Sequence, residues 1–153
     1  MILLLFVWRS YMNKNIKTTA QLLINKYKTN NPFELASALN IVVHILPLGN
    51  IKGFYKYYKR TKIIFINSEL DYFERLVVCA HELGHALFHP RVNIIFLNHN
   101  TFFVGSKLEL EANKFASELL LSDEILLNYS ECTFEQIAAA ENLNKELVIL
   151  KFQ

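Results

Sequence analysis

The chain has few of the residues that mark several protein classes. Its two cysteines, Cys79 and Cys132, are too few for a disulfide scaffold and favour a reducing compartment, so we expect a cytoplasmic protein. Only four glycines and three prolines occur, which excludes collagen-like and low-complexity sequences. No run of about 18 apolar residues exists, so neither a membrane-spanning helix nor a membrane partner is expected.

Acidic residues are almost absent from the first 68 residues. This segment holds ten basic residues and one acid, Glu34, whereas residues 69–153 hold six basic and thirteen acidic residues. The charges of the two segments are therefore +9 and −7, within a net charge of +2. Such an asymmetry is compatible with a nucleic-acid or acidic partner of the first segment, but blocks of charge more commonly form solvated surfaces, and we favour that interpretation.

Hydrophobic residues make up 52% of the chain, enough for one folded domain with a small appendage. The apolar residues 1–8 follow no basic residue and precede no small-residue cleavage site, unlike a signal peptide. We interpret residues 1–17 as an N-terminal extension, not necessarily native because Met12 offers another start; a membrane anchor is the less favoured alternative. Residues 18–125 are expected to form the main domain, with 126–153 as a small helical tail packed on it.

Capping residues, helical periodicity and β-branched runs predict an α+β fold. The expected helices are 18–27, 32–39, 68–89, 106–121 and two or three short ones at the end of the chain. The expected strands are 41–46, 54–58, 62–66 and 94–97. Strands come early and helices late, so we expect a small antiparallel or mixed sheet packed on the long helix 68–89. Ser68 and Asp71 resemble a capping box at the start of this helix. In the first helix, Leu22, Leu23 and Tyr27 are expected to face the core.

The long helix contains an H-E-x-x-H motif, His81-Glu82-Leu83-Gly84-His85. Residues four apart lie on one face of a helix, so both imidazoles can bind one metal ion. Glu82 projects about 100° away from them and can hold a water molecule at the ion. The alternative is a histidine-rich helix whose rings pair with each other and with the backbone, but we favour metal binding.

A third ligand is expected from another segment, because a catalytic zinc ion usually has three protein ligands. In the helix that follows Ser106, an apolar stripe includes Leu108 and Phe115, and Glu111 falls within it. A carboxylate that faces the core must be paired or bound to metal. We therefore predict Glu111 as the third ligand, with Glu109 in reserve as the capping-box acid. A salt bridge from Glu111 to a nearby basic residue is the alternative.

Two segments together, HELGHALFH and LEANKFASELLL, resemble the ImmA/IrrE family of bacterial and phage zinc metallopeptidases. The preceding segment GFYKYYKRTKIIFINSEL is similar to the hairpin that leads into the helix in that family. The resemblance covers about residues 20–125. Members often carry a longer DNA-binding region, which this short chain cannot hold in full.

The resemblance implies a gluzincin-like (zincin-like) peptidase fold, with His81, His85 and Glu111 as zinc ligands and Glu82 as general base. It also implies a function, the cleavage of a specific regulatory protein such as the transcriptional repressor of a mobile genetic element. Zinc is the expected metal, although Mn²⁺ and Fe²⁺ suit similar ligands. In this chemistry Glu82 would take a proton from the attacking water and pass it to the leaving amine.

A second donor to the oxyanion is expected but is not identified by the motif. The candidates are His89, His99, Tyr55 and Tyr57. His89 lies four residues after His85 and could reach the site, support it from behind, or simply cap the end of the helix.

The competing hypothesis is a non-catalytic, metal-containing module that regulates or binds protein or DNA. Glu82 favours the enzyme, because a structural metal site needs no base beside its ligand. The tail resembles a helix-turn-helix, but its second helix offers only Lys145 and Lys151 as basic residues, so DNA binding is not expected. The basic, aromatic hairpin could stack on nucleic acid or pair with an extended substrate, but core packing is the favoured interpretation.

Overall fold

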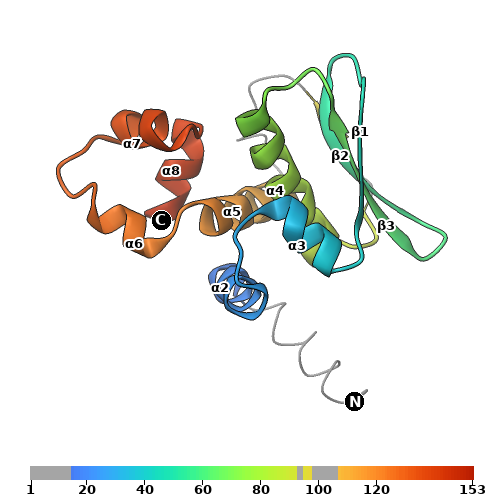
Figure 1. Ribbon diagram of the computed structural model, residues 1–153, viewed down its shortest axis with the longest axis horizontal. Helices are drawn as coiled ribbons and strands as arrows, with labels where there is room; N and C mark the ends of the chain where they lie inside the picture. Colours follow the sequence, from blue (N-terminus) through green and yellow to red (C-terminus); the bar gives the residue numbers. More distant parts are fainter. Residues whose placement is uncertain (1–14, 93–94, 98–106) are drawn as a thin grey trace.

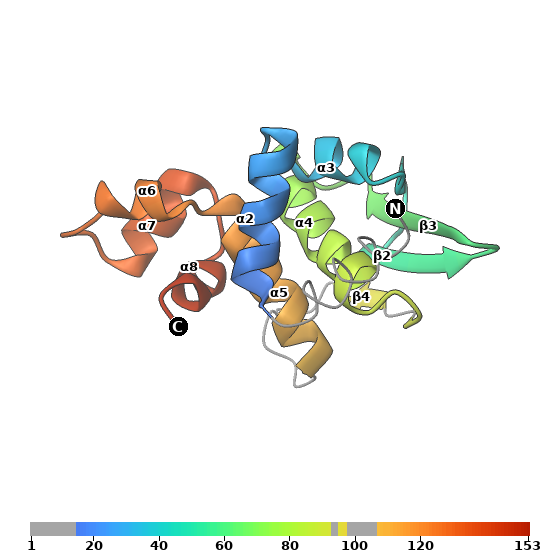
Figure 2. The same ribbon diagram turned by 90° about the horizontal axis from the view of Figure 1, so that it is seen from below.

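The computed structural model describes residues 15–92, 95–97 and 107–153, with the backbone alone for 95–97. Helix α4 lies between a four-stranded sheet and helix α5, and the C-terminal helices lie on the side of α5 away from the sheet (Figures 1 and 2). This arrangement confirms the predicted α+β fold with a small mixed sheet on a long helix. Most of the predicted extension 1–17 and the predicted cap Ser106 lie outside the described residues.

Helices α2 (Ile16–Tyr27) and α3 (Pro32–Ala38) follow asparagine caps. Asn15 accepts a hydrogen bond from the backbone of Thr18, so α2 begins two residues before its predicted start. The inward position predicted for Leu22 is wrong, since this side chain is 39% exposed. The buried face of α2 is formed by Thr19, Ala20 and Leu23, and Leu22 lies about 200° from Ala20 around the helix axis.

The sheet has the order β1-β3-β2-β4. Its strands are β1 (Val42–Leu46), β2 (Ile51–Tyr58), β3 (Thr61–Asn67) and β4 (Ile95–Leu97). β1 pairs with β3 in parallel, whereas the other pairs are antiparallel. The predicted β2–β3 hairpin is confirmed, and it closes through Lys59 and Arg60, whose φ angles of 44° and 65° suit a two-residue turn between twisted strands.

Helix α4 (Tyr72–Phe88) starts at a capping box formed by Asp71 and Glu74. Asp71 accepts from the backbone of Glu74 at 2.8 Å, and the Glu74 carboxylate accepts in return from the backbone of Asp71. The box predicted at Ser68 is therefore wrong by three residues. His89 caps the other end of the helix, and every residue from Val77 to Ala86 is buried.

Two glycines allow α4 to approach its neighbours closely. A Cβ atom on Gly53 of β2 would lie 2.5 Å from Val78 Cγ1 and 2.8 Å from the carbonyl oxygen of Phe65. A Cβ atom on Gly84 of α4 would lie 3.0 Å from the Cα atom of Ala112 on α5. Because glycine lacks this atom, the sheet and α5 pack directly against opposite sides of α4.

Helix α5 (Lys107–Leu120) is followed by α6 (Asp123–Leu127), α7 (Phe134–Glu141) and α8 (Lys145–Lys151). Ser117 on α5 donates to the carbonyl of Leu147 at 2.6 Å, and Lys151 pairs with buried Glu118 at 2.5 Å. α8 also contributes Leu147 and Leu150 to the main core. Among the described helices, none combines the length and hydrophobicity that crossing a membrane requires.

Candidate metal centre

Three side chains from α4 and α5 converge on one point. His81 and His85 lie one turn apart on α4, both buried, with their Nε2 atoms 3.1 Å from each other. Glu109 on α5 places one carboxylate oxygen 3.2 Å from His81 Nε2 and the other 3.1 Å from His85 Nε2. These three residues form the group of potential metal ligands found in the part of the chain that the structure describes.

The structure thus brings Glu109, and not the predicted ligand Glu111, to the two imidazoles. The Glu111 carboxylate instead accepts a hydrogen bond from His89 Nε2 at 2.7 Å. The difference arises from the rotation of α5 about its own axis. The face of α5 turned toward α4 carries Ala112, which packs on Gly84, and Glu109 lies three residues earlier on the same face.

Asn113 is a member of the site that the sequence analysis did not find. Its Oδ1 atom accepts from Nδ1–H of His81 at 2.7 Å, and both side chains are buried. With the proton on Nδ1, the lone pair on Nε2 of His81 faces His85 and Glu109. The available signal was spacing, since Asn113 follows Glu109 by four residues and so shares its helix face.

His89 lies behind His85, on the side away from Glu109. The two Nδ1 atoms of these histidines are 3.0 Å apart, and the other ring nitrogen of His89 contacts Glu111. Burial lowers the pKa of His89, which favours the neutral ring at pH 7, although the hydrogen bond to Glu111 opposes this shift.

Tyr55, one of the candidates for the second donor to the oxyanion, is buried on β2. Its hydroxyl donates to the carbonyl of Pro90 at 2.9 Å, which fastens the sheet to the end of α4. Burial raises the pKa of Tyr55 to about 12, so the hydroxyl keeps its proton at neutral pH. Of the other two candidates, Tyr57 is exposed on β2 and His99 lies outside the described residues.

Glu82 is fully buried beside His81, His85 and Glu109, which we call the ligand cluster. Neither carboxylate oxygen has a hydrogen-bond partner within the described residues. Burial raises the pKa of Glu82 to about 8; Glu109 adds to the increase, whereas His85 and the backbone of Tyr55 oppose it. An acid at this position can therefore both take and give a proton near neutral pH.

The pKa of Glu109 is shifted in the opposite direction to that of Glu82. Burial alone would raise the pKa of this carboxyl, but the close approach of the His81 and His85 rings holds it well below its usual range. Two carboxyl groups beside the same pair of imidazoles therefore differ in character: Glu109 is suited to bind a metal ion as a carboxylate, and Glu82 is suited to exchange a proton.

The donor set fits a divalent metal ion. The Asn113 contact leaves an imidazole lone pair on His81 that points at a carboxylate and a second imidazole, all largely shielded from water. Lone pairs gathered in this way repel each other, and a cation between them removes the repulsion. Two nitrogens and one carboxylate oxygen are also the ligand types common in catalytic zinc sites.

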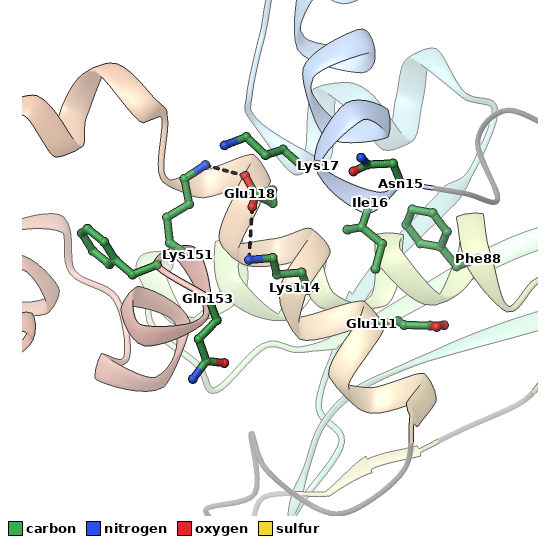
Figure 3. Close-up of a pocket in the computed structure, with 10 residues that line it drawn as sticks. Asn15, Ile16, Lys17, Phe88, Glu111, Lys114, Glu118, Lys151 and Gln153 are labelled. Carbon is green, nitrogen blue, oxygen red and sulfur yellow. Dashed lines mark hydrogen bonds and ion pairs between the residues drawn. The ribbon is translucent and has the colours of Figure 1, made fainter.

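A separate pocket of about 650 Å³ lies between α2, α5 and α8, and none of the three ligand candidates lines it (Figure 3). Lys114 and Lys151 flank the buried carboxylate of Glu118 there, and Glu111 and Phe88 lie at another part of its wall. Helix α5 therefore faces the ligand cluster on one side and a buried ionic contact with α8 on another.

Comparison with known proteins gives a consistent set of relatives. Residues 36–148 match peptidase family M78, described as the IrrE N-terminal-like domain. The chain is 50% identical over 141 residues to "uncharacterized immunity region protein 2" of Bacillus phage phi105, which covers 89% of this chain and 88% of the relative. It is 36% identical over 139 residues to the metallopeptidase ImmA of Bacillus subtilis (strain 168), which covers 87% of this chain and 81% of that protein.

Proposed function

We propose, on the premise that the chain belongs to the ImmA/IrrE family of metallopeptidases, that it is a zinc-dependent endopeptidase. Its substrate would be a specific regulatory protein, a transcriptional repressor of a mobile genetic element. The observation that carries the proposal is the convergence of His81, His85 and Glu109 beside buried Glu82. A metal site with a purely structural role does not require an unpaired carboxylate at its side.

We assign His81, His85 and Glu109 as the metal ligands and Glu82 as the general base. In catalytic zinc sites with three protein ligands, the fourth position is left for water or substrate. The same ligands bind Mn²⁺ and Fe²⁺, so metal analysis of the purified protein decides among the three ions.

The roles of the residues follow from their environments. When bound, the metal supplies a polarised carbonyl and a water molecule of lowered pKa. Glu82 accepts the proton of the attacking water and then donates it to the leaving amine. Burial favours the protonated form of Glu82 that the second transfer needs.

The choice of substrate is supported by the relatives. One is named an immunity region protein of a phage, and another is the metallopeptidase ImmA. Immunity of a lysogen depends on a repressor, so a peptidase of this kind would act on such a protein. We accordingly propose a cytoplasmic site of action, where repressors work.

The decisive experiment compares wild type with Glu82→Gln and Glu131→Gln. Glu131 is exposed in the tail, which makes its variant a matched control for the loss of one carboxylate. We expect all three proteins to bind about one equivalent of metal, and the rate of cleavage of a candidate repressor to fall about 10²- to 10⁴-fold in Glu82→Gln alone. Full activity of metal-loaded Glu82→Gln would exclude Glu82 as the general base.

The second candidate is a non-catalytic regulator that uses the metal for structure. The same three proteins distinguish this candidate from the peptidase. For a structural metal, removal of the metal lowers the melting temperature, and metal-loaded wild type cleaves no repressor. The basic first half of the chain would make salt-dependent binding to DNA the corresponding assay.

A further inference from the structure

Two polar side chains near the ligand cluster have no part in the proposed chemistry. His89 at the end of α4 joins His85 to Glu111, with its Nδ1 atom 3.0 Å from His85 Nδ1 and its Nε2 atom 2.7 Å from Glu111 Oε2. His89 is buried, and the Glu111 side chain is 30% exposed. The chain of contacts therefore runs from the protein surface to the back of one ligand candidate.

The positions of the protons follow from what each atom can do. An ionised carboxylate only accepts hydrogen bonds, so the 2.7 Å contact with Glu111 requires the proton on Nε2 of His89. In a neutral His89 the Nδ1 atom is then an acceptor. The 3.0 Å contact with His85 therefore requires the proton of His85 on Nδ1, which leaves the lone pair of His85 Nε2 directed at His81 and Glu109.

We propose that His89 and Glu111 are a positioning pair that holds His85 in the metal-binding tautomer. The pair does for His85 what Asn113 does for His81. Helix α5 would thus supply one ligand, Glu109, the residue that orients His81, Asn113, and the outer member of the pair that orients His85, Glu111. The functional part of this inference rests on the proposed metal site, whereas the tautomer itself does not.

Substitutions at position 89 separate the acceptor from the bulk of the ring. His89→Asn places an amide oxygen near the position of Nδ1, so it keeps an acceptor for His85. His89→Phe keeps an aromatic ring and leaves the buried Nδ1–H of His85 without a partner. His44→Phe makes the same replacement on exposed β1 and serves as the control.

We expect the dissociation constant for Zn²⁺, measured by competition with a chromogenic chelator, to rise about 10- to 100-fold in His89→Phe. His89→Asn should retain most of the affinity, and His44→Phe all of it. Equal affinities in His89→Phe and His44→Phe, with circular dichroism showing both folded, would overturn the proposal.

Substitutions at position 111 test the direction of the hydrogen bonds. Glu111→Lys offers His89 a donor in place of an acceptor, which reverses both protons and places the proton of His85 on Nε2. Glu111→Gln retains an acceptor oxygen and should resemble wild type. Leu110→Lys places a lysine at a neighbouring exposed position, with a net charge change of one unit instead of two, and serves as the control for an added positive charge.

The tautomer of His85 is read from long-range ¹H–¹⁵N spectra of the metal-free protein. We expect the proton on Nδ1 in wild type, Glu111→Gln and Leu110→Lys, and on Nε2 in Glu111→Lys. An unchanged tautomer in Glu111→Lys, or a proton on Nε2 in wild type, would refute the positioning role. If wild type shows the expected tautomer but binds no metal, the proposed function fails and the positioning contact stands.

Discussion

Substitution of Gly84 by alanine should lower the free energy of unfolding, although alanine in a helix interior ordinarily raises it. In the interior of a helix, alanine is more favourable than glycine by about 1 kcal/mol. The added methyl group of Gly84→Ala, however, would lie 3.0 Å from the Cα atom and 3.2 Å from the carbonyl oxygen of Ala112. Ordinary contacts of a Cβ atom lie at 3.4–4 Å, so Ala112 and α5 must shift by a few tenths of an ångström.

The balance of these effects gives a magnitude. Overpacking a close helix contact costs about 1–3 kcal/mol, so the net change in the free energy of unfolding is a loss of about 0–2 kcal/mol. The effect on metal binding should be larger in proportion, because a metal site tolerates ligand displacements of only about 0.2 Å and α5 carries Glu109. We expect the affinity for Zn²⁺ to fall at least about tenfold.

The assay is urea denaturation of the metal-free protein together with the chelator competition for Zn²⁺. Ala112→Gly is the partner variant, because it removes only the Cβ atom of Ala112, whereas the nearest atoms to the added methyl group belong to the backbone. The double variant Gly84→Ala/Ala112→Gly should therefore have a lower free energy of unfolding than Gly84→Ala alone. A Gly84→Ala protein that is about 1 kcal/mol more stable than wild type and binds metal normally would refute this account of the helix contact.

Three further outcomes are expected. Glu109→Ala should abolish stoichiometric metal binding, whereas Glu111→Ala should only weaken it, as measured by the metal content of the purified proteins. The reverse order would identify Glu111 as the third ligand. Lys151→Met leaves the buried Glu118 carboxylate without its closest cation and should cost about 3–5 kcal/mol in urea denaturation, much of which the double variant Lys151→Met/Glu118→Leu should recover. Hydrogen bonds from Lys151 and Lys17 lower the pKa of Asp123 in the folded state, so the stabilisation from this carboxylate is complete above its unfolded pKa and is lost as the pH falls through its folded pKa. The free energy of unfolding of wild type should exceed that of Asp123→Asn by up to about 1 kcal/mol at pH 7, and this difference should shrink as the pH is lowered below the unfolded pKa.

Local signals in the sequence were sufficient for much of the fold. The cap at Asn31 with Pro32, the β2–β3 hairpin and the helical H-E-x-x-H motif depend on neighbouring residues, and the structure contains all three. The parallel pairing of β1 with β3 joins strands that are distant along the chain, and no local pattern indicates it.

The third carboxylate shows where sequence reasoning stops. An apolar stripe indicates which side of a helix is buried, but α5 is covered on several sides, by α4, α2 and α8. Which buried side faces α4 is decided by the contact of Gly84 with Ala112, a tertiary feature. The same contact sets the position of Asn113 against His81, which explains why that residue was missed.

The sharing of α5 between the ligand cluster and α8 links the two ends of this helix energetically. Any ion that binds only the native protein stabilises it in proportion to the logarithm of its free concentration over its dissociation constant. Because the helix that carries Glu109 is also held to α8 by Ser117 and Glu118, part of that gain reaches the C-terminal helices. Removal of α8 would correspondingly weaken metal binding by the ligand cluster, although α8 does not contact the cluster residues Glu109, His81 and His85 through the bonds described above.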